Sequence, residues 1–454
     1  MLSLVAAVVL TQSPVTLQAL VPTSGANAEA LLDGNPATGW SPEGDAEGEG
    51  ILFRFEGSAK IAQVQVSACA KTRAAIRPYL NGNEGEVVTL GDALTPVSTS
   101  TSQKVRSVFL KFENATGSCL SEVRFLLDGK QVDVRAPVRL EAVAKASSVL
   151  SPADAYHPGY LFDGRLDFGW VEGVKGPGIG ESMTLTFTAP VTMVAVEVWN
   201  GYQRSDDHFK KNARAKKVTL TVDGAAAQEF TLKDAQGAQK LALTKPTSTK
   251  SLTLTIKEAY PGTKYDDLVL SELRVWDEQG PRSISTADLS ERATALKGDS
   301  SKTPLANFVD FNLRSVCQLQ GYELEAKFRS NHSFVVYRSA DEDTGAIKEV
   351  IDGTWILKDG KTVELFGRSH RNESSNDPYA SPGGRETTTI TGGALTVTRI
   401  SDLTKDAYAA LLKKFTTGPL RWSFDCDDAK KFDALSKKDA YVIEGRAVTA
   451  ILTR

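Results

Sequence analysis

The chain has 454 residues, enough for about three domains of ordinary size. Apolar residues make up 41% and charged residues 24%, as in folded proteins with a well-filled core. The net charge of −3 gives the chain no general attraction for nucleic acid or an anionic membrane, and after the N-terminus no run of about 18 apolar residues predicts a membrane span.

An apolar run opens the chain. Residues 2–10 are apolar except for Ser3, and a small residue suited to precede a cleavage site, Ala19, follows them. The pattern predicts a signal peptide over residues 1–19, and therefore a periplasmic, cell-surface or secreted protein. Signal peptides usually begin with a positive charge, whereas the first basic residue here is Arg54, so a buried first strand is the alternative.

An eight-residue segment that begins Asp-Gly and ends Gly-Trp occurs twice, at 33–40 and 163–170. Segments with the alternation of β-strands follow both copies in the same order, and the hairpin-type pairs Asn81-Gly82 and Asp223-Gly224 also correspond. The sequence therefore predicts an internal repeat of two all-β domains. The matched strand segments are 51–55 with 183–187, 61–66 with 193–198, and 120–124 with 270–274.

The second copy is longer than the first. From Trp40 to Glu122 the separation is 82 residues, and from Trp170 to Glu272 it is 102. Most of the added length falls in residues 200–217 and in the segment around residues 260–267. Because loops carry function on a rigid β scaffold, we expect the second copy to be the better equipped for binding.

The repeat resembles discoidin domains, also called coagulation factor 5/8 (F5/8) type C or galactose-binding-like domains. The Asp-Gly-Asn-x-x-Thr-x-Trp turn and the Leu-Ser-Glu strand of the first copy carry this resemblance, which implies a jelly-roll β-sandwich over residues 24–134. Residues 137–277 more specifically resemble the glycan-binding translocation domain of streptococcal NAD glycohydrolase, which implies a second jelly roll that binds glycan. The segments carrying the second resemblance are 170–181, 200–203, 211–214 and 260–267.

Sugar recognition needs an aromatic face for the apolar side of the ring and polar side chains for its hydroxyls. The two longer loops of the second copy supply both types of residue. The alternative is a solvated loop surface with its tyrosines packed inward. The predicted glycan-binding residues are Asn200, Tyr202, Arg204, Asn212, Arg214, Lys264, Tyr265 and Asp266.

The Asp-Gly turn also suggests a structural calcium site, because calcium prefers six to eight oxygen ligands. On the discoidin resemblance, the first-copy ligands are Asp33, Asn35 through its carbonyl, Thr38 and Glu122. In the second copy, Arg165 and Phe168 replace Asn35 and Thr38, which leaves Asp163 and Glu272. The alternative is an Asx-type turn without metal. Trp40 and Trp170, which close the turns, are expected in the core rather than in a sugar site.

The four cysteines fall into two groups, and neither has the spacing of a zinc or redox site. Cys69 and Cys119 lie in the first copy, whereas Cys317 and Cys426 lie in the C-terminal third. Pairing within each group is the simplest of three connectivities and suits an oxidising compartment. Four reduced cysteines in the core are the alternative.

Residues 278–304 are polar and interrupted by glycine and proline, so we expect a linker. Short alternating segments over residues 305–454 predict a small antiparallel β-barrel with one helix at 402–415. Residues 352–361 weakly resemble lipocalin-like barrels. The expected strands are 322–328, 333–338, 353–357, 362–366, 385–391 and 394–400, with turns at 359–361 and 392–393.

Two further functions are weighed from the sequence. Basic residues between Arg204 and Lys217 would suit nucleic acid, but Asp206 and Asp207 interrupt them, so no nucleic-acid partner is expected. No nucleophile elbow, Walker loop or zinc-protease motif is present, so catalysis is not expected. The sequence thus predicts an exported bacterial protein that binds glycan without catalysis. The alternatives are a structural envelope or adhesion protein with a protein partner, and an enzyme with appended carbohydrate-binding modules.

Overall fold

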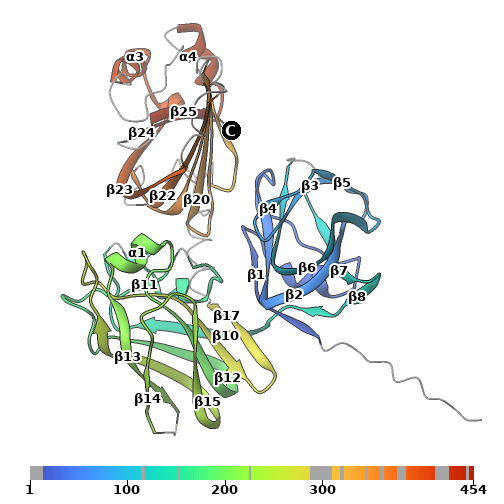
Figure 1. Cartoon of the computed structure of the whole chain (residues 1–454). Helices are drawn as coiled ribbons and strands as arrows, with labels where there is room; N and C mark the ends of the chain where they lie inside the picture. Colours follow the sequence, from blue (N-terminus) through green and yellow to red (C-terminus); the bar gives the residue numbers. More distant parts are fainter. Residues whose placement is uncertain are drawn as a thin grey trace, which may run out of the picture. The chain divides into compact units, whose positions relative to one another are not determined.

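A computed structural model gives the fold (Figure 1). The residues that it describes are 14–113, 118–151, 153–166, 168–223, 226–286, 309–316, 322–342, 345–357, 362–375, 385–414, 429–445 and 449–453. They form two separate sheets and one closed barrel. The fold is all-β, as the sequence predicts.

The first sheet has nine strands, and its main path runs in the order β4-β3-β6-β2-β1-β9, with β5 paired to β3, and β7 paired to β2 and β8. Its core is rich in aromatic rings, with Phe125 edge-on to both Phe53 and Phe55. The strands are β1 (Val15–Pro22), β2 (Gly50–Ala68), β3 (Ala74–Leu80), β4 (Asn83–Glu84), β5 (Val88–Leu90), β6 (Thr95–Phe112), β7 (Leu120–Leu127), β8 (Lys130–Val132) and β9 (Val134–Arg135).

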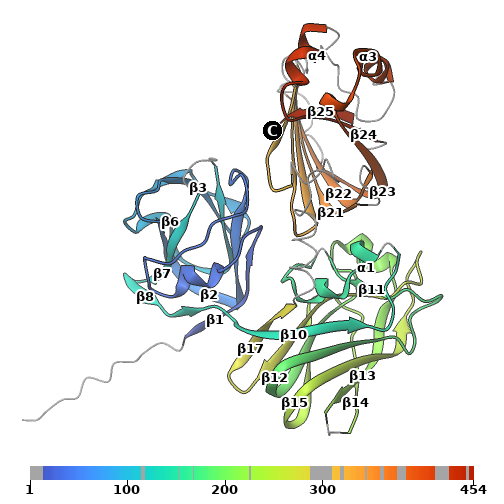
Figure 2. The same cartoon turned by 180° about the vertical axis from the view of Figure 1, so that it is seen from behind.

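The second sheet has eight strands in the order β11-β16-β17-β10-β12-β15-β13-β14. Figure 2 shows β10, β12, β15, β13 and β14 side by side in that order. The strands are β10 (Val138–Ala146), β11 (Trp170–Val171), β12 (Ser182–Asn200), β13 (Arg214–Val222), β14 (Gln228–Thr231), β15 (Ala238–Tyr260), β16 (Val269–Asp277) and β17 (Gly280–Thr286).

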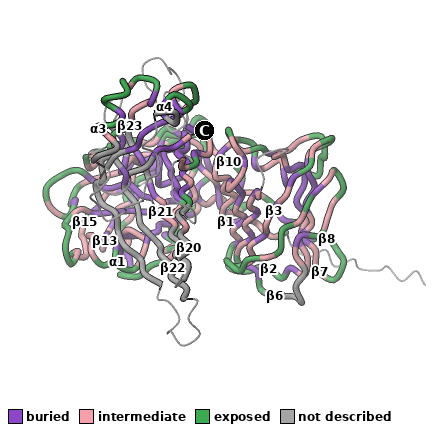
Figure 3. The backbone as a smooth tube through the Cα atoms, turned by 90° about the horizontal axis from the view of Figure 1, so that it is seen from above, coloured by how far each residue is buried: buried purple, intermediate pink, exposed green. Residues whose placement is uncertain are grey.

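Buried residues follow the strands, whereas exposed residues gather in the loops between them (Figure 3). The two predicted strand segments of each copy join into one long strand with a register shift. In β2 the shift lies between Arg54 and Ala59, and in β12 it lies between Thr186 and Val191. The two copies therefore share an irregularity as well as a strand order.

The repeat extends to individual hydrogen bonds. Trp40 and Trp170 are fully buried, and their indole Nε1 groups donate to the carbonyls of Ser24 and Ser148, at 3.1 and 2.9 Å. Each tryptophan bridges to a leucine of the last matched strand, Leu120 or Leu270. The two tryptophans are thus core residues, as expected from the sequence.

A glycine precedes each tryptophan because the backbone of the last matched strand passes too close for a side chain. A Cβ atom at Gly39 would lie 2.6 Å from the carbonyl oxygen of Leu120, and one at Gly169 would lie 2.5 Å from that of Leu270. The Gly-Trp pair of the repeat is therefore a packing requirement.

A carboxylate clamp, absent from the sequence-based expectations, also repeats. The Glu49 carboxylate accepts hydrogen bonds from the hydroxyls of Thr23 and Ser24. In the second sheet, Glu181 accepts from Ser147 and Ser148 in the same way. In each sandwich, the clamp joins the residues directly after the first strand, β1 or β10, to the residue before the long strand β2 or β12.

The C-terminal residues form a closed barrel with strand order β18 to β25. Trp355 is fully buried in its core and lies edge-on to Phe328, at 5.8 Å between ring centroids. The strands are β18 (Leu313–Ser315), β19 (Tyr322–Phe328), β20 (Ser333–Glu342), β21 (Gly345–Leu357), β22 (Thr362–Ser375), β23 (Arg385–Arg399), β24 (Ala440–Gly445) and β25 (Thr449–Thr453).

Two expectations for the barrel are wrong. Gly392-Gly393 does not form a turn but lies inside β23, where the pairing with β22 shifts register between Leu365 and Gly367. Glycine here marks a bulge rather than a hairpin. The predicted helix at 402–415 is present as α3 (Lys405–Lys414), but a second helix, α4 (Ala429–Leu435), packs its Phe432 against Tyr408. The predicted turn at 359–361 falls outside the described residues.

Two boundaries also differ from expectation. Val15–Pro22 form β1, which pairs with β2 and buries Leu17, so a signal segment ending at residue 19 would divide a strand. The apolar run at residues 2–10, for which a signal peptide and a buried strand were the two alternatives, lies outside the described residues, so the signal peptide stays a prediction. Gly280–Thr286 form β17, which pairs with β16 and β10, so the predicted linker at 278–304 begins with a strand.

The first predicted disulfide is present. Cys69 and Cys119 are bonded, with their Cα atoms 5.3 Å apart. Cys317 and Cys426 lie outside the described residues, so their pairing stays a prediction. Within the described residues, no helix has the length and apolar character needed to cross a membrane.

Removing the Cys69–Cys119 bond should destabilise the first sandwich by about 4 kcal/mol, because the unfolded chain would regain the entropy of a 50-residue loop. We expect the double variant Cys69→Ser, Cys119→Ser to shift one calorimetric transition, that of the first sandwich, to lower temperature. A reducing agent should shift the wild type and leave the variant unchanged. Identical scans for the two oxidised proteins would contradict this account.

Candidate functional site

The first inserted loop of the second sandwich contains a short helix, α1 (Asp206–Lys211), which lies at the same end of the sheet as β11 (Figure 1). Ser205 caps it, since the Ser205 hydroxyl accepts the backbone N–H of His208. Acidic residues occupy its first turn and basic residues its last, as the helix dipole favours. The sequence therefore fixes both ends of this helix.

The second inserted loop bonds to the last carbonyls of α1. The backbone N–H of Thr263 donates to the Lys210 carbonyl at 3.0 Å, and those of Lys264 and Tyr265 donate to the Lys211 carbonyl at 3.2 and 2.8 Å. The final carbonyls of a helix have no partner within it, so the second loop satisfies them. Two insertions about 50 residues apart in the chain thus form one structural unit.

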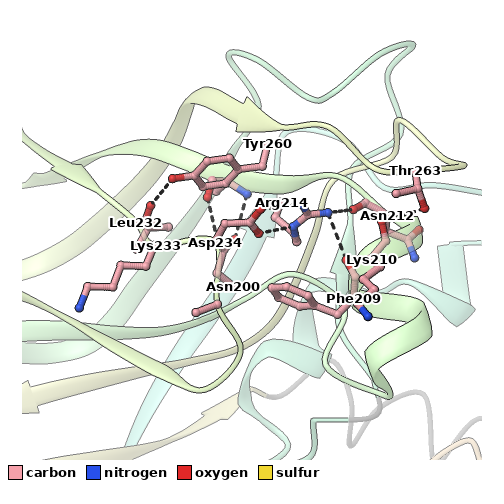
Figure 4. Close-up of polar contacts among 12 residues, drawn as sticks. Asn200, Phe209, Lys210, Asn212, Arg214, Leu232, Lys233, Asp234, Tyr260 and Thr263 are labelled. Atoms are coloured by element: carbon pink, nitrogen blue, oxygen red, sulfur yellow. Dashed lines mark hydrogen bonds and ion pairs between the residues drawn. The ribbon is translucent and has the colours of Figure 1, made fainter.

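Arg214 holds this unit to the sheet (Figure 4). Its Nε and Nη2 atoms donate to both carboxylate oxygens of Asp234, at 2.6 and 2.9 Å. Its Nη1 donates to the carbonyls of Asn212 and Phe209, at 2.7 and 3.2 Å, and its guanidinium lies over the Phe209 ring. Because Arg214 is also 7% exposed, its hydrogen bonds serve the loop rather than a ligand.

Asn200 and Asn212 have internal partners as well. The fully buried Asn200 amide donates to the Ala215 carbonyl and accepts its N–H, at 2.7 and 2.9 Å. The Asn212 amide donates to the His208 carbonyl at 2.9 Å. Three of the eight predicted glycan-binding residues, Asn200, Asn212 and Arg214, therefore shape the loops from within.

Aromatic and charged residues of the second sandwich gather near Tyr156. The Arg204 guanidinium lies over the Tyr202 ring, 5.0 Å from its centroid. The pKa of Tyr156 is raised to about 12, mainly by burial and then by the nearby Tyr202, Asp267 and Tyr265, whereas Arg204 acts to lower it. These five residues, here called the tyrosine cluster, combine aromatic faces with a cation and a carboxylate.

The outer side of the tyrosine cluster is polar and exposed. The Lys264 ammonium lies 4.9 Å from the centroid of the Tyr265 ring, and a hydrogen bond with Tyr265 raises the pKa of Lys264. Tyr265 is 38% exposed, and Asp266 beside it is also exposed. Five predicted residues, Tyr202, Arg204, Lys264, Tyr265 and Asp266, thus belong to or border one cluster.

Sequence reasoning missed Tyr156 and His208. Tyr156 lies two residues before η3 (Pro158–Phe162), and the corresponding residue before η1 (Ala28–Leu32) in the first copy is Ala26. An alignment of the repeats extended upstream of the two Asp-Gly turns would have revealed this difference. His208, whose ring lies 5.1 Å from that of Tyr202, carries no comparable signal because it looks like an ordinary helix residue.

The first-copy turn is compact and rich in oxygen. The Thr38 hydroxyl donates to the Asp33 carboxylate and the Asn35 carbonyl, both at 2.7 Å, while the Asp33 carboxylate accepts the Asn35 N–H. The Asn35 side-chain oxygen accepts the N–H of Ala37, and the Asn35 backbone carbonyl also accepts the N–H of Thr38, at 3.0 Å. Carboxylate, hydroxyl and carbonyl oxygens therefore lie close together, and these are ligand types that calcium prefers. The bonds that Asp33 and Asn35 accept two residues on are also those of the Asx-type turn expected as the alternative.

Glu122, the fourth predicted ligand, lies in β7, is 3% exposed and accepts a hydrogen bond from Arg124 Nε at 3.0 Å. In the described part of the chain, no group of three or more histidine, cysteine, aspartate or glutamate side chains is arranged to hold a metal. A cation in this turn would consequently depend on the hydroxyl and carbonyl oxygens of Thr38 and Asn35.

In the second-copy turn, two arginine side chains lie beside Phe168, the residue that corresponds to Thr38. The guanidinium groups of Arg165 and Arg204 lie 4.5 and 5.9 Å from the ring centroid of Phe168. Asp163 accepts the Arg165 N–H at 2.8 Å, and Glu272 lies in β16. Because two arginines supply positive charge there, the second turn fits a metal ion less well than the first.

The fold and the loop cluster define a tandem β-sandwich protein whose second sandwich is elaborated at one end. A family model described as the NAD glycohydrolase translocation F5/8 type C domain matches residues 138–276, which is the elaborated sandwich. The resemblance expected from the sequence is thereby confirmed for this segment. No curated protein matches the chain.

Three solved structures are similar at low identity. The paired carbohydrate-binding modules (CBM32) of Clostridium perfringens ZmpB with GalNAc share 13% identity over 57% of this chain and 90% of theirs, with a TM-score of 0.25. The family 32 module of C. perfringens NanJ with galactose shares 13% over 30% and 92%, with a TM-score of 0.24. A fucolectin from striped bass, Morone saxatilis, shares 11% over 56% and 94%, with a TM-score of 0.23.

Arg214→Lys should destabilise the second sandwich by about 2 kcal/mol, because lysine keeps the charge but cannot reproduce the fork that bonds Asp234, Asn212 and Phe209. Chemical denaturation of the full chain would measure this. Arg135→Lys is the matched control, since Arg135 also forms a forked pair, with Asp133, but is exposed. Equal effects of the two substitutions would contradict the internal role of Arg214.

Proposed function

We propose that the chain is an exported bacterial protein that binds glycan without catalysis, through the tyrosine cluster of its second sandwich. The observation that carries the proposal is the bonding of the two inserted loops into one unit, which brings Tyr202 and Tyr265 together with Tyr156. The match of residues 138–276 to an F5/8 type C family model supports it.

The chemistry of the tyrosine cluster suits a sugar. Tyrosine rings offer rigid apolar faces for the C–H side of a pyranose at low entropic cost. Their hydroxyls, with Asp267, Asp266 and Lys264, supply donors and acceptors around these faces. Arg204 is as buried as Arg214, at 7% exposed, so the charges offered to a ligand are those of Lys264, Asp266 and Asp267. Because both signs are present among them, the cluster accommodates neutral sugars as well as charged ones.

Glycan binding should depend on Tyr265, which is exposed, and on Tyr202, which is half-buried. We expect Tyr202→Ala and Tyr265→Ala each to weaken binding about tenfold, because each removes one stacking face. The measurement is a glycan array with the full chain in calcium, followed by titration of the strongest ligand. Galactose and N-acetylgalactosamine are suitable first probes.

Tyr337→Ala is the control, because Tyr337 is an equally exposed tyrosine of the barrel, at 37% against 38% for Tyr265. It should leave affinity unchanged. Absence of any glycan binding by the wild type, or unaltered affinity in both cluster variants, would refute the proposal.

We further propose that the first turn holds a structural calcium ion through Asp33, Thr38 and the Asn35 carbonyl, with Glu122 as a further ligand. Calcium at 100 times its dissociation constant would stabilise the first sandwich by about 2.7 kcal/mol. A chelator should therefore lower the melting temperature of the wild type, and Asp33→Asn should abolish this response. Glu86→Gln, at an exposed carboxylate of the same sandwich, should respond like the wild type. A wild-type midpoint indifferent to chelator would count against the site.

A further inference from the structure

A buried carboxylate lies beneath the tyrosine cluster. Glu172, directly after β11, is fully buried. One carboxylate oxygen accepts the Val174 N–H at 2.8 Å, and the other accepts the Leu268 N–H at 3.1 Å. Burial of a carboxylate is costly unless hydrogen bonds compensate it, so these two bonds are what keeps the charge inside.

The two bonds connect different parts of the site. Val174 belongs to the 172–181 loop, whereas Leu268 ends the second inserted loop, immediately after Asp267. The Glu172 backbone N–H also donates to the Leu268 carbonyl, at 3.3 Å, and the Ala213 N–H donates to the Asp267 carbonyl, at 3.0 Å. Glu172 therefore fixes the end of the segment that carries Tyr265 and Asp267.

The 172–181 loop closes over Glu172. Gly178 has a positive φ of 64°, and a Cβ atom there would lie 2.6 Å from Cγ of Glu172. Only a glycine allows the backbone to approach the carboxylate so closely in this conformation. The contact excludes water from Glu172 and strengthens its two hydrogen bonds.

We propose that Glu172 is a positioning residue of the glycan site, which holds the 172–181 loop and the Tyr265–Leu268 segment in the arrangement that binds ligand. The proposal rests on the proposed function of the tyrosine cluster. A neutral side chain at this position would leave one of the two backbone N–H groups without an acceptor and would release the Tyr265–Leu268 segment.

Protonation of Glu172 should have a similar effect. Burial raises the pKa of Glu172, the two N–H bonds lower it, and the neighbouring carboxylates of Asp267 and Glu181 raise it. The raised pKa means that the folded chain takes up this proton more readily than the unfolded chain, so acid does not destabilise the fold through Glu172. Protonation nevertheless converts one acceptor oxygen into a hydroxyl, and the affinity for glycan should fall as pH decreases through this pKa.

The test compares Glu172→Gln with Glu49→Gln in the full chain. Glu49 is an equally buried carboxylate that accepts two hydrogen bonds, but it lies in the first sandwich. Hydrogen exchange reports on loop order without any ligand, and titration with the strongest array glycan from pH 5 to 8 reports on binding. Calorimetry shows whether each variant is still folded, so that a change in exchange or in binding is not mistaken for loss of the fold.

We expect Glu172→Gln to increase exchange in residues 172–181 and 263–268, to weaken binding about tenfold and to flatten the pH profile. Glu49→Gln should lower stability and leave affinity unchanged. If wild type and both variants bind equally, the positioning role is refuted while the proposed function stands. If the wild type binds no glycan, the proposed function itself fails. Should Glu172→Gln not fold, absence of hydrogen-exchange protection at the Val174 and Leu268 amides of the wild type would still overturn the proposal, because these are the two N–H groups that Glu172 accepts.

Discussion

The last carbonyls of α1 must find hydrogen-bond donors outside the helix, and the binding end of the second sandwich depends on how they do so. The donors are the backbone N–H groups of residues 263–265, which belong to the other inserted loop. This bonding holds Tyr265 at the end of α1, and the Asp234 and Glu172 carboxylates then fix the two loops from within. A binding surface made of loops thereby acquires the rigidity of the sheet below it.

The two sandwiches share the same scaffold and differ in the residues added to it. Both keep the buried tryptophan, the glycine before it and the carboxylate clamp of Glu49 or Glu181. They differ at the Asp-Gly turn, where Thr38 faces Asp33 in the first copy and Phe168 faces arginines in the second. The turn that marks the repeat is therefore a structural element, and the residues added around it carry the proposed function.

Much of the fold followed from sequence, because alternation and turn residues are local signals. The Asn81-Gly82 hairpin turn is an example, with both residues at positive φ. Polarity alone did not reveal whether a loop residue points outward. Asn200 and Arg214 have the residue types of sugar ligands, yet their partners are internal, and Tyr156 was overlooked because it lies outside the insertions. The turn predicted at Gly392-Gly393 was wrong for a similar reason, because glycine occurs both in turns and in bulges.

The most direct test of the central claim, that the two inserted loops form one glycan site, is a crystal structure of the full chain with its strongest array glycan. The account predicts a sugar ring against Tyr202 or Tyr265, with Tyr156 and Asp267 nearby and with the α1 carbonyls still bonded to residues 263–265. A sugar bound only to the first sandwich or to the barrel, with the tyrosine cluster empty, would contradict it.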